Sequence, residues 1–134
     1  MKKLVAVVIL GTAAITAQAE TVYTPVGTPV SCTGQHFNIS SANEVLYKSR
    51  ACKLPLVNSK NMRQYTFAAQ GMAWDGCWEN LLGDRVALIS SDGSEEVRDK
   101  IGFVVSELAR TGDAVVTKSP MQDIYKKQGR ELCN

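Results

Sequence analysis

Apolar and polar residues alternate through the middle of the chain, and this two-residue period predicts β-strands. The alternation covers residues 65–74, and two further apolar runs follow at residues 77–82 and 85–90. The runs are separated by Asp75-Gly76 and Gly83-Asp84, whose residues accept the positive φ angles of tight turns. We therefore predict an antiparallel β-meander over about residues 65–90.

After the meander, apolar residues recur every three or four positions, a spacing that favours a helix. These residues are Val97, Ile101, Val104, Val105 and Leu108. Ser94 precedes them as a candidate N-cap, and Gly112 follows as a stop. A second helix is expected from Ser119-Pro120 to Gly129, after a short strand over residues 114–117. The predicted fold class is α+β: a small antiparallel sheet packed with one or two C-terminal helices.

The segment before the meander fits two descriptions. The capping-box pattern Ser41-Ala42-Asn43-Glu44 favours a short helix over about residues 42–52. The alternation that includes Val45 and Tyr47 favours a strand over the same residues, so both alternatives stay open. Residues 21–30 contain two prolines, which suits an extended segment at the edge of a sheet.

Residues 1–19 have the three parts of a cleaved export signal. Lys2-Lys3 supplies the positive start, residues 4–15 are mostly apolar, and Ala17-Gln18-Ala19 is a small-residue cleavage site. The apolar run is shorter than the roughly 20 residues that a bilayer-spanning helix requires. We predict a bacterial signal peptide whose removal leaves residues 20–134 as a single domain, in the periplasm or secreted, without a membrane anchor.

Four cysteines remain in that domain: Cys32, Cys52, Cys77 and Cys133. In an oxidising compartment, an even number in a small domain indicates two disulfides. We favour Cys52 with Cys77 and Cys32 with Cys133. The first two lie in strand-like runs, and the other two lie near the ends of the mature chain. Pairing Cys32 with Cys52 and Cys77 with Cys133 remains the alternative.

The charge pattern argues against nucleic acid as a partner. The formal net charge is +2, and the two lysines of the signal account for it. Basic residues of the mature chain are interleaved with acidic ones, so no basic stripe is available for a row of phosphates.

Catalytic templates find little support in the sequence. His36 is the only histidine, so any Ser-His-Asp or Cys-His site would have to use it, and the cysteines are expected to be oxidised. No phosphate-binding or dinucleotide motif and no metal-ligand spacing occurs, so no cofactor and no metal are expected. Asp75 and Glu79 could form the carboxylate pair of a glycoside hydrolase, but a turn residue and an outward strand residue explain them more simply.

Two tryptophans flank Asp75-Gly76 in the sequence. We expect Trp78 in the core and Trp74 at the surface, because tryptophan is a frequent anchor of protein interfaces. Strand alternation places Met72 on the same face as Trp74. The predicted binding residues are therefore Trp74, Met72 and Asp75.

These observations favour an exported, non-catalytic envelope protein that binds another protein. Such a protein could be an inhibitor, an immunity partner, or an accessory subunit of a transport, conjugation or phage-related system. The alternative is a small periplasmic hydrolase that acts on cell-wall material with Asp75, Glu79 or His36. Convergence of these three residues in one cleft would support the enzyme, whereas scatter beside an exposed aromatic patch would support binding.

Overall fold

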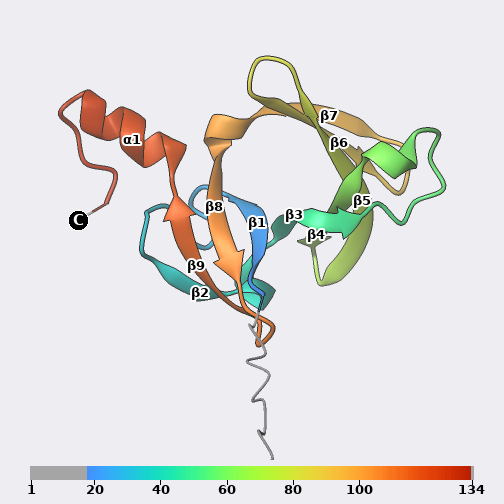
Figure 1. Cartoon of the computed structure of the whole chain (residues 1–134), viewed down its shortest axis with the longest axis horizontal. Helices are drawn as coiled ribbons and strands as arrows, with labels where there is room; N and C mark the ends of the chain where they lie inside the picture. Colours follow the sequence, from blue (N-terminus) through green and yellow to red (C-terminus); the bar gives the residue numbers. More distant parts are fainter. Residues whose placement is uncertain (1–17, 134) are drawn as a thin grey trace, which may run out of the picture.

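A computed structural model describes residues 18–133 and shows a β-rich fold with one α-helix (Figure 1). The predicted signal sequence lies outside the described residues except for Gln18 and Ala19. The described chain forms the strands β1 (Glu20–Pro25), β2 (His36–Asn38), β3 (Glu44–Ala51), β4 (Arg63–Ala69), β5 (Met72–Leu81), β6 (Arg85–Ser90), β7 (Glu95–Asp99), β8 (Phe103–Leu108) and β9 (Asp113–Lys118). It also forms the helix α1 (Pro120–Lys127) and the short 3-10 helices η1 (Ile39–Ser41), η2 (Ser59–Asn61) and η3 (Lys100–Gly102).

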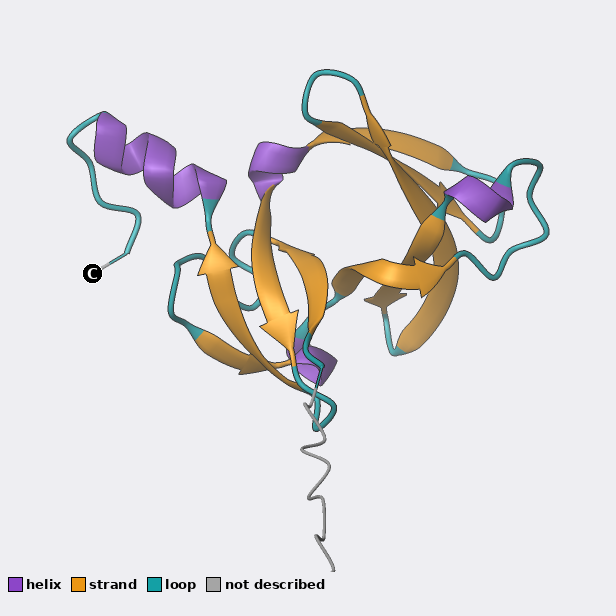
Figure 2. Cartoon of the chain, viewed as in Figure 1, coloured by secondary structure: helices purple, strands orange, loops and turns teal. Residues whose placement is uncertain are grey.

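All nine strands belong to one sheet in the order β2-β9-β8-β1-β3-β4-β5-β6-β7. Every neighbouring pair is antiparallel. Figure 2 shows that the sheet is strongly curled, with β4 to β7 on one side and β8, β9 and β2 on the other. The helix α1 follows β9 and contacts β8 and η3. The α+β class is thus broadly consistent with the structure, with one C-terminal helix.

The curl encloses an apolar core on the inner face of the sheet. Its buried members come from β3, β4, β5, β6 and β8: Leu46, Tyr65, Trp78, Val86, Leu88 and Phe103. Trp78 is only 2% exposed, its indole Nε1 donates to the carbonyl of Tyr47 at 3.0 Å, and its ring meets Tyr23 edge to face. The expectation that Trp78 belongs to the core is therefore consistent with its position.

A second apolar layer covers the opposite face of β1, β3 and β8. Successive strand residues point to opposite faces, so Val22, Val45 and Val104 lie in this layer while their neighbours Tyr23, Leu46 and Phe103 lie in the first. β1 is therefore buried on one face and partly buried on the other, and it is paired on both edges, with β3 and β8. The expectation of an edge segment at residues 21–30 was wrong. Its prolines fall at or beyond the end of β1, where they interrupt no ladder.

The meander over about residues 65–90 is present as β4, β5 and β6, but its first turn is displaced. Asp75 and Gly76 lie inside β5, paired with β4 and β6, and the turn falls at Gln70-Gly71. Both residues of that turn have positive φ, 51° and 76°, as a tight hairpin turn of type I′ requires. The second turn lies at the predicted Gly83-Asp84, and β6 has the predicted bounds of residues 85–90.

Gly76 is needed for packing rather than for a turn. A Cβ atom at this position would lie 2.6 Å from the Tyr65 ring and 2.6 Å from the Ile89 carbonyl oxygen. Glycine within a strand often marks such a close approach. The Asp-Gly pair is therefore explained by the Tyr65 ring, which lies over Gly76 from the paired strand β4.

The predicted helix around residues 94–108 was wrong: the segment forms β7, the 3-10 helix η3 and β8. β8 has one fully buried face and is paired on both edges, with β1 and β9, so its run of β-branched residues suits a central strand. Val97 lies on β7 and is 47% exposed, so it does not share one apolar face with the residues of β8. The helical spacing arose because the apolar residues belong to two strands, β7 and β8, that lie in different parts of the sheet.

Two other local predictions were confirmed, and one alternative was decided. Residues 113–118 form β9, and α1 begins at Pro120 after the N-cap Ser119, whose hydroxyl accepts from the Gln122 amide. The segment at residues 42–52 is a strand, β3. Its capping-box residue Glu44 instead binds Tyr65 and Arg98 across the sheet.

The structure contains the disulfides Cys32–Cys133 and Cys52–Cys77, the pairing favoured from the sequence. Disulfides are rare in reducing compartments, so both bridges support a protein that folds outside the cytoplasm. Within the described residues, no helix is long and apolar enough to cross a membrane.

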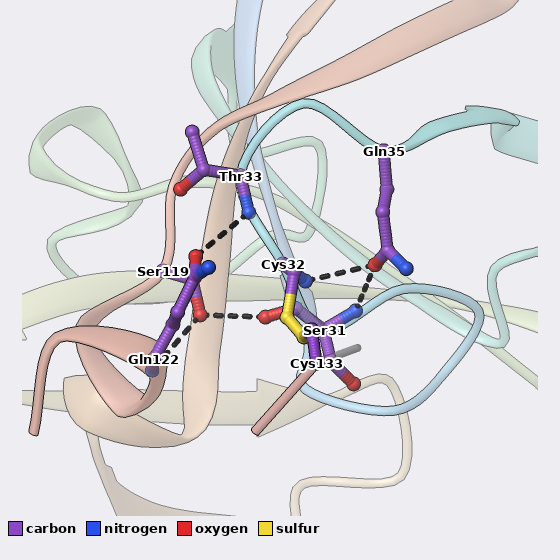
Figure 3. Close-up of a disulfide and its surroundings, with 7 residues drawn as sticks. All are labelled: Ser31, Cys32, Thr33, Gln35, Ser119, Gln122 and Cys133. Carbon is purple, nitrogen blue, oxygen red and sulfur yellow. Dashed lines mark hydrogen bonds between the residues drawn. A yellow bond between two sulfur atoms is a disulfide. The ribbon is translucent and has the colours of Figure 1, made fainter. Parts of the chain in front are cut away.

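The Cys32–Cys133 bridge ties the end of the chain to the loop before β2, and hydrogen bonds reinforce it (Figure 3). The Ser119 hydroxyl donates to the carbonyl of Ser31 at 2.6 Å, and the Thr33 amide donates to Gln122 at 3.0 Å. The loop, α1 and the C-terminal segment therefore form one connected unit.

Candidate functional site

A row of three aromatic rings crosses the inner face of β4 and β5. Phe67 lies opposite Trp74 in the ladder, and their rings stack at 5.0 Å between centroids with an angle of 18° between planes. Tyr65 also stacks on Phe67, at 5.4 Å and 18°. Tyr65 is buried, whereas Phe67 and Trp74 are half-buried. This aromatic row therefore runs from the core to the surface, with Trp74 at its outer end.

The structure brings together two of the three predicted binding residues. Met72 is 56% exposed and lies two positions before Trp74 on β5, so both belong to the same face of the strand. Asp75 is exposed but occupies the alternate position, on the opposite face. Its prediction rested on a turn that the structure replaces with a strand.

A hollow of about 460 Å³ lies beside the outer end of the aromatic row. Its lining residues come from β4, β5, β6 and the turn after β6: Phe67, Trp74, Ser90, Ser91 and Asp92. Neither Phe67 nor Asp92 is among the binding residues predicted from the sequence. Phe67 lies within the predicted alternation of residues 65–74 and could have been found from it, whereas the position of Asp92 depends on how the β6–β7 turn meets β5.

Arg98 links β7, at one end of the sheet, to β3 in its middle. Its Nη1 and Nη2 donate to both oxygens of Glu44 on β3, at 2.7 and 3.0 Å. Its Nε and Nη2 also donate to both oxygens of Glu96 at 2.7 Å, and these bonds hold the pKa of Glu96 below its ordinary value. Strands β3 and β7 are separated by three others in the sheet order. The paired hydrogen bonds of Arg98 therefore hold together two strands that are not neighbours, and they stabilise the curl of the sheet.

The Tyr65 hydroxyl completes this network from inside the sheet. It donates to Glu44 at 2.6 Å, so one carboxylate receives both the tyrosine and the arginine. Burial, followed by the hydrogen bond and the negative charge of Glu44, raises the pKa of Tyr65 well above its ordinary value of 10.0. The aromatic row is therefore anchored at its inner end by a polar contact as well as by packing.

The raised pKa of Tyr65 predicts a specific loss of stability in alkali. Above about pH 10 the unfolded chain loses the phenolic proton while the folded protein keeps it, so the free energy of unfolding falls by up to about 1.4 kcal/mol per pH unit. The Tyr65→Phe variant should lack this contribution. Urea unfolding from about pH 9 to about pH 11 measures both proteins, and equal slopes would show that the phenol does not resist ionisation.

The residues considered for catalysis do not converge. His36 is on the edge strand β2, whereas Asp75 and Glu79 are on β5, six places away in the sheet order. Asp75 and Glu79 are four residues apart on one strand, which separates their Cα atoms by about 13 Å. Paired carboxylates of glycoside hydrolases are about 5 to 9.5 Å apart. This arrangement does not provide the carboxylate pair of the hydrolase alternative.

Larger hollows exist but have less suitable walls. One, of about 970 Å³, includes Gln18 and Ala19 in its lining, and the predicted cleavage would remove both. Another, of about 590 Å³, lies next to α1 and has a mixed set of three lysines and two aspartates. Among the described residues, no cluster of three or more histidine, cysteine, aspartate or glutamate side chains could hold a metal ion.

Comparisons of the chain with protein-family models, with curated proteins and with solved structures found no match. The candidate site therefore rests on the geometry of the aromatic row and its hollow.

Proposed function

We propose that this chain is an exported, non-catalytic envelope protein, in the periplasm or secreted, that binds another protein through the outer end of the aromatic row. The observation that carries the proposal is the half-buried stack of Trp74 on Phe67, with exposed Met72 beside it. Aromatic residues and methionine are enriched in protein interfaces, and tryptophan is among the commonest energetic anchors.

The stack also lowers the cost of binding. An exposed tryptophan loses rotamer freedom when a partner covers it, and that loss reduces affinity. Trp74 is already restrained by Phe67, and Phe67 is restrained by Tyr65 in turn. The surface offered to a partner is therefore preorganised. A carboxylate pair for hydrolysis is lacking on β5, which leaves binding as the function that the described geometry supports better.

The Trp74→Ala variant tests this function. Truncation of an interface anchor typically costs 2 kcal/mol or more, which corresponds to at least about a tenfold loss of affinity. Tagged residues 20–134 would be used to capture proteins from an envelope extract of the host, with quantification by mass spectrometry. We expect Trp74→Ala to lose at least about nine-tenths of the specifically captured partner.

Leu82→Ala is the matched control. Leu82 is an apolar residue that is 91% exposed on the β5–β6 turn, away from the aromatic row. It should leave capture unchanged. Circular dichroism and the melting temperature must show that Trp74→Ala is folded. Normal capture by folded Trp74→Ala, or equal losses in both variants, would contradict the proposed function.

A further inference from the structure

The hollow beside Trp74 combines aromatic walls with a carboxylate. Phe67 and Trp74 supply the rings, and Asp92, Ser90 and Ser91 supply the polar groups. None of these lining residues, all within the described chain, is a lysine or an arginine. The negative charge of Asp92 thus has no cationic side chain beside it in the lining of the hollow.

Asp92 retains an available hydrogen-bond acceptor. The backbone amide and the hydroxyl of Ser94 both donate to its Oδ1, at 2.9 and 2.7 Å. These bonds hold the pKa of Asp92 below its ordinary value, so the group is charged at neutral pH. Among the described residues, Oδ2 receives no hydrogen bond from a side chain or from the Ser94 amide.

The arginine at the inner end of the aromatic row is already engaged. Arg98 has its guanidinium bonded to Glu44 and Glu96, so it is held within the network that fastens the curl. The two carboxylates together carry more negative charge than this one arginine. None of these three residues lines the hollow, so Asp92 is the charged side chain that a ligand meets there, beside the aromatic surface.

We propose that this hollow binds an arginine side chain carried by the protein partner, with the guanidinium stacked on the ring of Trp74 that lines the hollow and donating to Asp92. The proposal rests on the proposed function, since it names the chemistry of the partner that the aromatic row would bind. A guanidinium is planar, stacks on aromatic faces and presents five N–H donors, so it can satisfy the carboxylate and the serine oxygens together. A purely apolar side chain would instead cover Asp92 without a partner, at a cost in free energy.

The same chemistry occurs elsewhere in this chain. The guanidinium of Arg50 lies over the Tyr47 ring at 3.8 Å from its centroid, while Glu20 accepts from the Arg50 Nε at 2.9 Å. An arginine between an aromatic face and a carboxylate thus already occurs on this surface. At the hollow, the aromatic face and the carboxylate are present, and the partner would supply the arginine.

A pair of blocked tripeptides tests the proposal directly. One is acetyl-Gly-Arg-Gly-amide, and the other carries citrulline, which has nearly the same shape as arginine but no charge. Binding is followed by NMR through the indole N–H signal of Trp74, assigned with Trp74→Phe. The signal of buried Trp78, which is bonded to Tyr47, serves as an internal reference. We expect the arginine peptide to shift the Trp74 signal and the citrulline peptide to bind at least about fivefold more weakly.

Asp92→Asn and Asp75→Asn form a matched pair of variants. The amide introduced by Asp92→Asn would keep an oxygen that accepts from Ser94, so the turn should be retained while the charge is lost. Asp75 is an exposed carboxylate on the opposite face of β5. Asp92→Asn should weaken binding of the arginine peptide at least about fivefold, whereas Asp75→Asn should leave it unchanged.

The outcomes separate this inference from the proposed function. Equal binding of both peptides, no effect of Asp92→Asn, or equally strong binding of a neutral cell-wall oligosaccharide would overturn the arginine site. If that happens while Trp74→Ala still loses the partner, the proposed function stands without it. If the arginine peptide binds as expected but folded Trp74→Ala captures its partner normally, the hollow is an arginine site and the proposed function fails.

Discussion

Replacing Cys32 and Cys133 together with alanine is expected to lower the free energy of unfolding by about 4 to 5 kcal/mol. The bridge spans 101 residues of sequence, so its loss frees most of the chain in the unfolded state. A small domain has only about 5 to 15 kcal/mol of net stability, so the variant should be marginal at 37 °C. Urea unfolding of the variant and the parent protein, both oxidised, measures the difference.

The second disulfide provides the comparison. Cys52 and Cys77 are 25 residues apart, so the same chain-entropy argument gives a smaller loss of about 3.5 kcal/mol for the Cys52/Cys77 double alanine variant. The order of the two variants is the decisive result. A larger loss on removing Cys52–Cys77 would show that local packing, rather than the length of the closed loop, governs the contribution of these bridges.

Trp78→Ala is expected to cost about 3 to 5 kcal/mol, the usual range for truncating a buried aromatic residue. The ring lies inside the curled sheet against Tyr23, and its indole donates to the carbonyl of Tyr47. Truncation leaves a cavity and removes the donor. Thermal unfolding should show a much lower midpoint, or no cooperative transition.

Trp78→Phe separates the two parts of this effect. It keeps a ring in the core but lacks the indole donor, so its cost should be clearly smaller than that of Trp78→Ala. An unchanged midpoint in Trp78→Ala would show that the ring does not support the core. The contrast with Trp74→Ala, which should fold, distinguishes the tryptophan of the core from the tryptophan of the surface.

Local signals predicted the elements that depend on local physics. The Ser119-Pro120 start of α1 was readable because a cap and a first-turn proline act within one turn. β6 was readable because it is a short apolar run between turn residues. The favoured cysteine pairing rested on strand-like runs and chain ends, which are features of the sequence itself, although these features left a second pairing open.

The same local rules gave wrong predictions where the structure depends on contacts between residues that are distant in the sequence. Gly76 reads as half of a turn, but the ring that requires it belongs to Tyr65 on another strand. Residues 94–108 read as a helix because the spacing of apolar residues in β7 and β8 happens to resemble one. From the sequence alone, a glycine required by a closely packed side chain cannot be distinguished from a glycine required by a turn.

The candidate site was partly predictable for the same reason. Trp74 and Met72 were assigned to one face from alternation within a single strand, and both lie on β5 in the structure. The aromatic row and its hollow also require Phe67 and Asp92, which reach Trp74 only through the pairing of β4 and the turn after β6. Residue type and spacing pointed to Trp74 and Met72, and strand order supplied their surroundings.

β1 pairs with β8, which lies far from it along the sequence. Thr21 donates to Glu107 across 86 residues of sequence, so the fold has a high contact order and is expected to form slowly. The disulfides are nested, with Cys52–Cys77 inside Cys32–Cys133, rather than consecutive. In a chain exported from its N-terminus, Cys32 and Cys52 would enter the oxidising compartment well before Cys133. Oxidation in order of arrival would join the wrong pair, so correct pairing in such a chain would require either oxidation delayed until the partner cysteine has crossed or thiol–disulfide exchange of the first bond formed.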